Sequence, residues 1–291
     1  DWINVDGNWE CPETILENIT ISNNWSAKDG GGIFTSLTWD LSLSSVSIVQ
    51  NVSGLNGGGC FLSESKLSLV DVSITNNTGK YRGGGLYIID DGGTNFSSEL
   101  RCNIHSNTLL NGSSGVDLYL SGGGEVTIDT FTVMSPTSYY AAPLADLEFD
   151  ILNAVNEQVE ADLFVSPDGN DGNDGLMAET PLKTIKHAHS IIHTDSLNPR
   201  IIYLSDGIYS PSTNGESFPL DLMENISLTG TSENATILDA EETGRVINID
   251  YIDQTTIKNL SVRGGSSDAG GGMRIDESSP NIMNVTIQNN T

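Results

Sequence analysis

Val46-Ser47-Ile48-Val49-Gln50-Asn51, followed by Gly57-Gly58-Gly59, is one copy of a phrase that recurs along the chain. In the neighbouring copies the glycine triplet stands 27 residues earlier and 26 residues later, always nine positions after the second apolar residue of the phrase. A fixed period in the twenties is typical of solenoid proteins, in which each repeat forms one coil. The other copies are 19–24 with 30–32, 72–77 with 83–85, a looser one at 102–107 with Gly115-Val116, and late ones at 260–262 with 270–272 and at 285–290.

Each copy alternates apolar and polar residues over about five positions, which predicts a short strand with one buried face. No helical pattern of roughly 10–15 residues separates the copies, so the sequence predicts an all-β, right-handed parallel β-helix with coils of about 25–30 residues. Ile21, Ile48, Ile74 and Ile104 should then form one inward stack. The residue after each triplet is expected at an inward position; these residues are Ile33, Cys60, Leu86 and Met273. The alternative, a β-sandwich, gives no reason for one long phrase to recur in register.

The repeat divides the chain into three parts. Residues 1–130 are expected to be the C-terminal part of a first β-helix, and residues 131–161 its terminal coils or a linker. A new pattern starts at Asp162, and residues 162–291 are expected to open a second β-helix whose later coils lie beyond Thr291. Leu182, Ile185, Ala188 and Ile192 have helical spacing, which predicts a short capping helix near 181–194, with Thr180 as its N-cap.

Residues 162–263 resemble a module of unknown function that opens many bacterial and archaeal surface β-helix proteins, within the pectate-lyase-like superfamily. The similarity implies that the short helix caps the open end of a β-helix, where apolar core and unpaired strand edges would otherwise be exposed. It implies little about activity. The residues that carry it are 165–167, 169–171, 174–175, 181–185, 206–209, 215–220 and 228–230.

Composition limits the function classes. Twelve basic residues stand against 39 acidic ones, a net charge of −27, which repels phosphate backbones and argues against nucleic-acid binding. No apolar run approaches the roughly 20 residues that span a bilayer, and the opening Asp1-Trp2-Ile3 shows no signal-peptide pattern. Cys11, Cys60 and Cys102 have no metal-ligand spacing, and Cys60 and Cys102 fall at repeat positions filled elsewhere by apolar residues, so both are expected to be buried thiols.

The stretch of residues 168–174 suggests a metal site. Glycines alternate with oxygen-bearing side chains there, and Ca²⁺ prefers six to eight oxygen ligands. The spacing is not that of an EF-hand, and a tight turn before the capping helix is the alternative. The candidate ligands are Asp168, Asn170, Asp171, Asn173 and Asp174.

Other residues give weaker signals. His187, His189 and His193 lie near the predicted helix, but no third zinc ligand accompanies them. Eleven Asn-X-Ser/Thr sequons are present; they indicate either glycosylation or the plain adjacency of Asn turns to Ser/Thr strands. Outward acidic and basic residues of the second β-helix could serve a lyase, although no lyase signature accompanies them: Asp239, Arg245, Asp250, Asp253, Arg263, Asp268 and Arg274.

These observations favour a secreted or cell-surface structural or adhesive protein, with polysaccharide or other surface proteins as partners. No catalytic residue is assigned. The alternative is a calcium-dependent polysaccharide lyase or another carbohydrate-active enzyme, for which a basic residue near three clustered carboxylates would be the sign.

Overall fold

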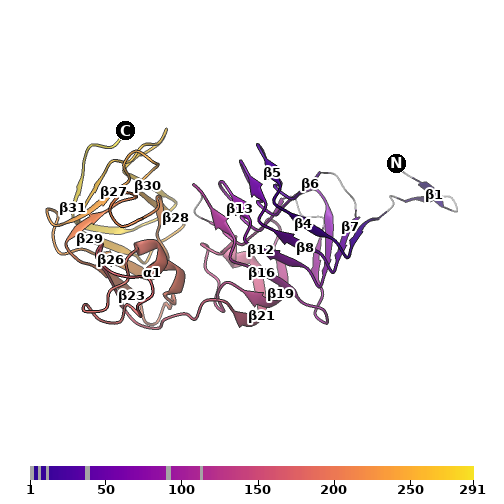
Figure 1. The fold of residues 1–291 in the computed structure, drawn as a ribbon, viewed down its shortest axis with the longest axis horizontal. Helices are drawn as coiled ribbons and strands as arrows, with labels where there is room; N and C mark the ends of the chain where they lie inside the picture. The colour runs from indigo at the N-terminus through magenta and orange to yellow at the C-terminus, as the bar shows by residue number, and fades with distance from the viewer. Residues whose placement is uncertain (1–2, 6–7, 11–12, 37–39, 90–92, 112–113) are drawn as a thin grey trace. The chain divides into compact units, whose positions relative to one another are not determined.

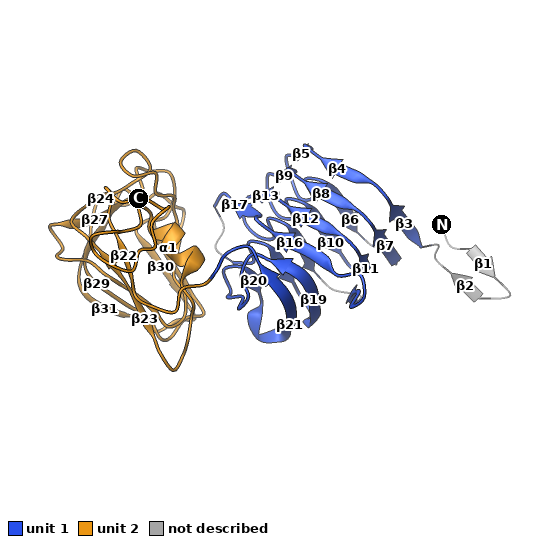
Figure 2. Cartoon of the chain, turned by 60° about the horizontal axis from the view of Figure 1, so that its bottom comes forward, with its two compact units in different colours: residues 1–157 blue, residues 158–291 orange. Residues whose placement is uncertain are grey.

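The computed structural model describes all residues except 1–2, 6–7, 11–12, 37–39, 90–92 and 112–113 (Figure 1). Contacts divide the chain into two compact units, residues 1–157 and 158–291 (Figure 2). Each unit is a right-handed parallel β-helix, and together they make about ten turns within the described residues. The predicted fold class is confirmed.

The described residues of unit 1 form four parallel sheets, whose strands follow one another in coil order. Figure 2 shows these strands lying side by side along the unit. The first sheet holds β6 (Ile33–Ser36), β10 (Cys60–Ser63), β14 (Leu86–Ile89), β18 (Leu118–Leu120) and β20 (Ala141–Ala142). The second holds β3 (Thr14–Glu17), β7 (Asp40–Ser44), β11 (Lys66–Val70) and β15 (Thr94–Phe96). The third holds β4 (Thr20–Ser22), β8 (Ser47–Val49), β12 (Ser73–Thr75), β16 (Cys102–His105), β19 (Gly124–Phe131) and β21 (Leu147–Ala154). The fourth holds β5 (Trp25–Ser26), β9 (Val52–Ser53), β13 (Thr78–Gly79) and β17 (Thr108–Leu109).

Two smaller features complete unit 1: the antiparallel pair β1 (Ile3–Val5) and β2 (Asn8–Glu10), and the 3₁₀ turn η1 (Leu144–Asp146). Because β20 and β21 extend the first and third sheets, residues 141–154 form the last coil of this unit. The boundary between the units follows Glu157.

Unit 2 contains two parallel sheets and one helix. The larger sheet holds β22 (Leu163–Val165), β23 (Arg200–Leu204), β26 (Ile226–Thr229), β29 (Thr256–Arg263), β27 (Thr236–Asp239), β24 (Gly207–Tyr209) and β31 (Asn281–Ile287). The smaller holds β25 (Leu220–Asp221), β28 (Ile247–Asp250) and β30 (Met273–Asp276). The helix α1 (Ile185–Ile191) packs against β22, the first strand of the unit. No helix among the described residues is long and apolar enough to cross a membrane.

The predicted inward stack is present. Ile21 pairs with Ile48, Ile48 with Ile74, and Ile74 with Ile104, and the last three are fully buried. A second column aligns Ile33, Cys60 and Leu86, while Met273 continues the equivalent column of unit 2 below Ile247. Like residues therefore stack on like, as a core shared by all coils requires.

Cys60 and Cys102 are buried free thiols, as expected from their repeat positions. Burial raises the pKa of Cys102 to about 11 and that of Cys60 further still. Both therefore stay protonated and act as small apolar side chains. Cys11 lies outside the described residues.

A ladder of buried asparagines runs beside the apolar stack in unit 1. The side-chain amide of Asn77 donates to Ile48 O at 2.9 Å and to Asn107 Oδ1 at 3.1 Å, while its own Oδ1 accepts from the main chain and side chain of Asn51. Asn51 and Asn77 are 0% exposed, which only a fully hydrogen-bonded amide tolerates at low cost. Asn290 of unit 2 makes the equivalent bonds to Val262 O and Gly265 N.

The asparagine ladder explains why the third position of each triplet is a glycine. In the triplet 83–85, Gly83 has φ +58°, a backbone conformation that other residues rarely adopt. A Cβ on Gly84 would clash with the carbonyl oxygen of Thr108, and one on Gly85 would lie 2.6 Å from Asn107 Nδ2. The third glycine thus makes room for the next asparagine of the ladder; the same pairing joins Gly32 with Asn51, Gly59 with Asn77, and Gly272 with Asn290.

Asp117 ends the ladder and takes the third-glycine position of its coil. Its Oδ1 accepts from Asn107 N and Nδ2, at 3.1 and 2.9 Å, and its buried Oδ2 accepts no comparable bond. Burial raises the pKa of Asp117 from 3.8 to about 6, and the donors of Asn107 and the nearby Thr132 hydroxyl offset this only in part.

Replacing Asp117 by Asn should therefore stabilise unit 1 at pH 7.5, by about 2 kcal/mol. Because the pKa is raised in the folded state, wild-type unit 1 should gain stability as the pH falls from 6 to 4, and D117N should lack this gain. Urea unfolding of both proteins at pH 7.5 and pH 4.5 measures the difference. Equal pH dependence in the two proteins would contradict the assignment.

Six of the eleven sequons begin at an asparagine with a left-handed backbone conformation. Asn18, Asn76, Asn225, Asn259, Asn284 and Asn289 all begin sequons and all have positive φ. Asn favours this left-handed conformation more than most residues do. The backbone conformation thus favours asparagine at these six positions, and Asn51, which begins another sequon, is fully buried.

Candidate functional site

The capping helix is shorter than predicted and starts later. Its N-cap is Thr184, whose hydroxyl accepts from His187 N at 3.1 Å, so the assignment of Thr180 was wrong. The predicted apolar face is confirmed, since the side chains of Leu182, Ile185, Ala188 and Ile192 are at most 2% exposed. Thr180 instead donates to Asp174, inside the preceding loop.

Glu216 completes the cap from a distant part of the sequence. Its carboxylate accepts from Ile185 N at 2.6 Å and Lys186 N at 3.1 Å, the first two amides of α1, which would otherwise lack partners. The side chain is 2% exposed, and burial raises its pKa to about 7, against the lowering effect of these amides. Glu216 is therefore a structural carboxylate, positioned to hold α1 on the end of unit 2.

His189 faces inward from α1 and is 2% exposed, with Nε2 unpartnered. Burial, helped by Lys186, lowers its pKa to about 4. Because the unfolded chain binds a proton more readily, unit 2 should lose up to about 3 kcal/mol through this group as the pH falls from 6.5 to 4.

His189→Leu should therefore leave stability near neutrality almost unchanged and make unit 2 more stable than wild type at pH 4. Thermal unfolding followed by circular dichroism at pH 7.5 and 4 measures this crossover. An equal shift at both pH values would show that packing, and not protonation, controls the effect.

The loop 168–174 forms a hydrogen-bonded turn before the helix. Asp171 accepts from Lys183 N, Thr184 N and the Thr184 hydroxyl at 2.8–2.9 Å, and Asp174 Oδ1 accepts from Leu176 N and Thr180. Asn170 Oδ1 accepts from Gly172 N, Asn173 Nδ2 donates to Pro181 O, and Asp168 N donates to Ser166.

The five candidate metal ligands are thus close in sequence, but the side chains of Asn170, Asp171, Asn173 and Asp174 bond to different partners. No group of three or more His, Cys, Asp or Glu side chains, within the part of the chain that the structure describes, is arranged to hold a metal ion. Calcium binding by Asp168, Asn170, Asp171, Asn173 and Asp174 stays a prediction.

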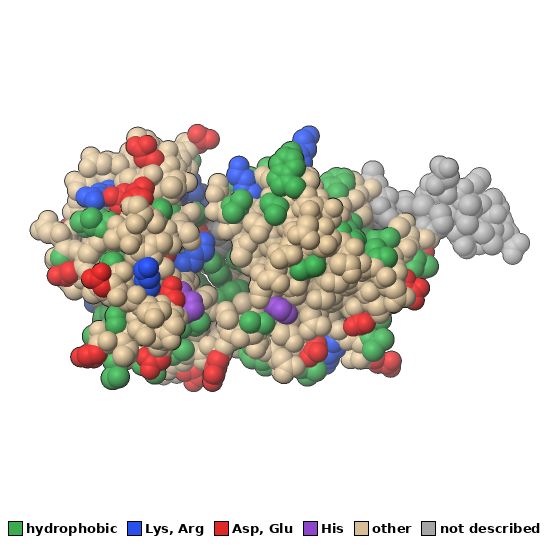
Figure 3. All heavy atoms as spheres, viewed as in Figure 1, with side chains coloured by type: hydrophobic (Ala, Val, Ile, Leu, Met, Phe, Trp, Pro, Cys, Tyr) green, Lys and Arg blue, Asp and Glu red, His purple; other side chains and the backbone are tan. Residues whose placement is uncertain are grey.

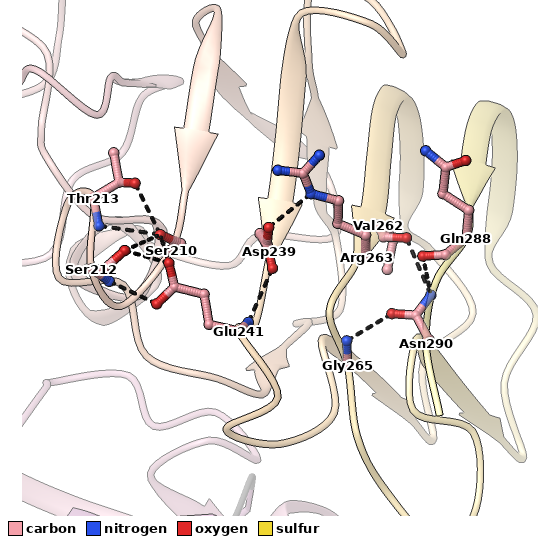
Figure 4. Close-up of polar contacts among 10 residues, drawn as sticks. All are labelled: Ser210, Ser212, Thr213, Asp239, Glu241, Val262, Arg263, Gly265, Gln288 and Asn290. Atoms are coloured by element: carbon pink, nitrogen blue, oxygen red, sulfur yellow. Dashed lines mark hydrogen bonds and ion pairs between the residues drawn. The ribbon is translucent and has the colours of Figure 1, made fainter.

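An outward polar row follows the carboxyl ends of β24, β27, β29 and β31 (Figure 4). Arg263 Nε pairs with Asp239 Oδ2 at 2.7 Å, joining adjacent coils. Beside this pair, the hydroxyls of Ser212 and Ser210 donate to Glu241 and hold its pKa below the ordinary value. Glu241 is therefore an ionised acceptor, poorly suited to donate a proton as a catalytic acid.

Most of the remaining charged candidates are also hydrogen-bonded within or between coils. Arg274 pairs with Asp250 and Asp276, and Arg245 donates to Asn248 Oδ1, Ser267 Oγ and the carbonyls of Ala269 and Gly270. The Asp253 main chain donates to Glu224, and Asp268 lies in the turn before Gly270. Arg274 is thus in direct contact with two carboxylates, and Asp221 stands in the same register column two strands away.

Acidic side chains are spread over the face drawn in Figure 3 and are not gathered in one place. The arrangement of the charged groups is that of a solvated solenoid surface, in which pairs between coils add modest stability.

Unit 2 also contains a shallow surface hollow, which no sequence pattern predicted. It lies on the outward face of β22, β23 and β26 and has a volume of about 320 Å³. Phe164 and Tyr203 stack within it, with ring centroids 5.1 Å apart and planes 20° apart. The alternation of inward and outward residues in 163–165 and 200–204 could have placed both rings outside, but the loop that encloses them is irregular.

Comparison with known proteins gives one family. Residues 167–291, under half of the chain, match the family model described as protein of unknown function DUF1565. No curated protein and no solved structure matches the chain. The match covers the capped unit and supports that part of the resemblance inferred from residues 162–263, so unit 2 is similar to a DUF1565 domain built as a parallel β-helix.

Proposed function

We propose that this chain is a rigid structural or adhesive β-helix module of a secreted or cell-surface protein. The observation that carries the proposal is the use of the recurring polar residues: the asparagines of the phrase are buried and bonded to one another, so the repeat serves the scaffold. A solenoid of this kind forms an extended, regular surface without needing a catalytic centre.

The surface chemistry supports the same proposal. The arginines named from the sequence, Arg245, Arg263 and Arg274, bond to neighbouring coils, and the net charge of −27 favours solubility in a crowded or salty medium. The resemblance to surface β-helix proteins of the pectate-lyase-like superfamily points to polysaccharide or other surface proteins as partners.

Antibodies raised against residues 1–291 test the location. Intact cells of the source organism should be labelled, and brief protease treatment of intact cells should remove the label. Labelling that requires permeabilised cells would contradict the proposal.

The lyase alternative has a direct assay. Incubation with polygalacturonate and other acidic polysaccharides in calcium should release no unsaturated sugars, which absorb near 235 nm. Product formation that depends on calcium and is lost in R274A would replace the structural proposal by an enzymatic one, and R82A in unit 1 is the matched control.

From the sequence pattern, we also propose that the loop 168–174 binds calcium. A specific site should raise the melting temperature of unit 2 in calcium above that in magnesium or sodium at matched ionic strength, because Mg²⁺ tolerates irregular oxygen cages poorly. Simple screening would act equally with all three salts. Coincident melting curves would leave the loop as a turn.

A further inference from the structure

The hollow over β22, β23 and β26 is a surface concavity of unit 2. Its floor is the outward face of the sheet, and Ala178 and Pro181, from the loop before α1, form one wall. Its volume of about 320 Å³ lies at the lower end of ligand pockets, which span roughly 300–1,000 Å³. The hollow therefore has room for a single ring-sized group.

Two stacked aromatic rings form the floor of the hollow. Phe164 and Tyr203 occupy matching positions on adjacent parallel strands, so both point outward and their rings stack. Both side chains are only half-buried, and the next residue in this register is the much smaller Thr229. The change from a ring to a threonine leaves space over the floor beside Tyr203.

The lining of the hollow is uncharged and mainly apolar. Four hydroxyl residues are among those that line it, and none of the described residues that line the hollow carries a charge. Thr231 and Ser205 already bond to Asp206, and the Thr229 hydroxyl oxygen is buried. The hydroxyl residues are Ser166, Ser205, Thr229 and Thr231.

A flat, half-exposed aromatic floor in an uncharged hollow suits a ligand with one flat apolar face and polar edges that can stay in contact with water. A sugar ring has this form: its C–H groups cover an aromatic face while its hydroxyls bond to the rim or to water. The uncharged lining, on a chain with a net charge of −27, disfavours acidic sugars and nucleotides.

We propose that this hollow binds one sugar ring of a neutral glycan, in contact with Phe164 and Tyr203. The inference rests on the proposed adhesive function and gives it a site and a ligand class. Contact with a single ring predicts weak binding at each site, so attachment to a surface would depend on many copies acting together.

Native gel electrophoresis through soluble polysaccharides tests the proposal. Migration of the full chain should be retarded by at least one neutral polysaccharide among β-glucan, galactomannan, xylan and arabinogalactan, and should be unaffected by polygalacturonate. The double variant F164L/Y203L keeps apolar bulk but removes both rings, so retardation should fall at least tenfold. The exposed Tyr251, 72% accessible and outside the hollow, provides the control variant Y251A, which should bind as wild type.

Circular dichroism melts establish that the double variant is folded before its binding is compared. No retardation by any of the neutral polysaccharides, or equal retardation of wild type and a folded F164L/Y203L, would overturn the inference. Surface labelling of cells tests the proposed function separately, so a module that is displayed but does not bind sugars would contradict this site alone.

Discussion

Replacing Asn77 by alanine should lower the unfolding free energy of unit 1 by about 4 kcal/mol, and its melting temperature by about 10 °C. The variant leaves Ile48 O and Asn51 N buried without their partner and opens a cavity beside the core. Each orphaned buried group costs about 1–3 kcal/mol, and the cavity adds to this. Urea unfolding followed by far-ultraviolet circular dichroism measures the loss.

Asn95→Ala is the matched control for this prediction. Asn95 lies in β15 of the same unit but is exposed, so its replacement should change stability by less than about 0.5 kcal/mol. If N77A and N95A proved equally mild, the buried ladder would not support the coils.

Replacing Glu216 by glutamine should destabilise unit 2 by about 3 kcal/mol at pH 7.5. The new amide group would place a donor against one of the two helix amides that the carboxylate now binds, at Ile185 and Lys186. Since the pKa of Glu216 is raised to about 7, protonation should stabilise wild-type unit 2 as the pH falls from 7 towards 4.5, a gain that E216Q should lack. His189 acts in the opposite direction over nearly the same range, so E216Q should be the more acid-sensitive protein.

Glu179→Gln provides the control, because Glu179 is exposed in the loop before α1. Melting curves of wild type, E216Q and E179Q at pH 7.5 and 4.5 separate the effects. A wild-type-like curve for E216Q would mean that α1 does not depend on this carboxylate.

The fold could be predicted because successive coils repeat the same pattern of buried and exposed residues. Ile48 and Ile74 occupy the same phase as their neighbours, so a short strand period and a long repeat period together define both the buried face and the stacking direction. The buried position of Asn77 was harder to foresee, because an asparagine beside glycines indicates a turn as readily as a hydrogen-bonded ladder.

The candidate site was less accessible to sequence reasoning, because its contacts join residues far apart in the chain. Glu216 caps a helix that begins 31 residues earlier, and no local sequence pattern predicts the bond from Ile185 N to its carboxylate. Conversely, Asp171 stands in a stretch typical of a metal loop, yet it bonds to Lys183 and Thr184. Composition identifies oxygen-bearing side chains, whereas only the folded chain determines where they point.

Hydrogen exchange of the backbone amides of Asn51, Asn77 and Asn107 tests the scaffold most directly. These amides lie at turns, yet each donates to a buried oxygen of the next ladder side chain, at 2.9–3.1 Å. They should exchange as slowly as the core strand amides of Ile48 and Ile74, and Asn51 should lose its protection in N77A. Exchange within minutes at pH 7, as in ordinary exposed turns, would contradict a solenoid held together by its recurring asparagines.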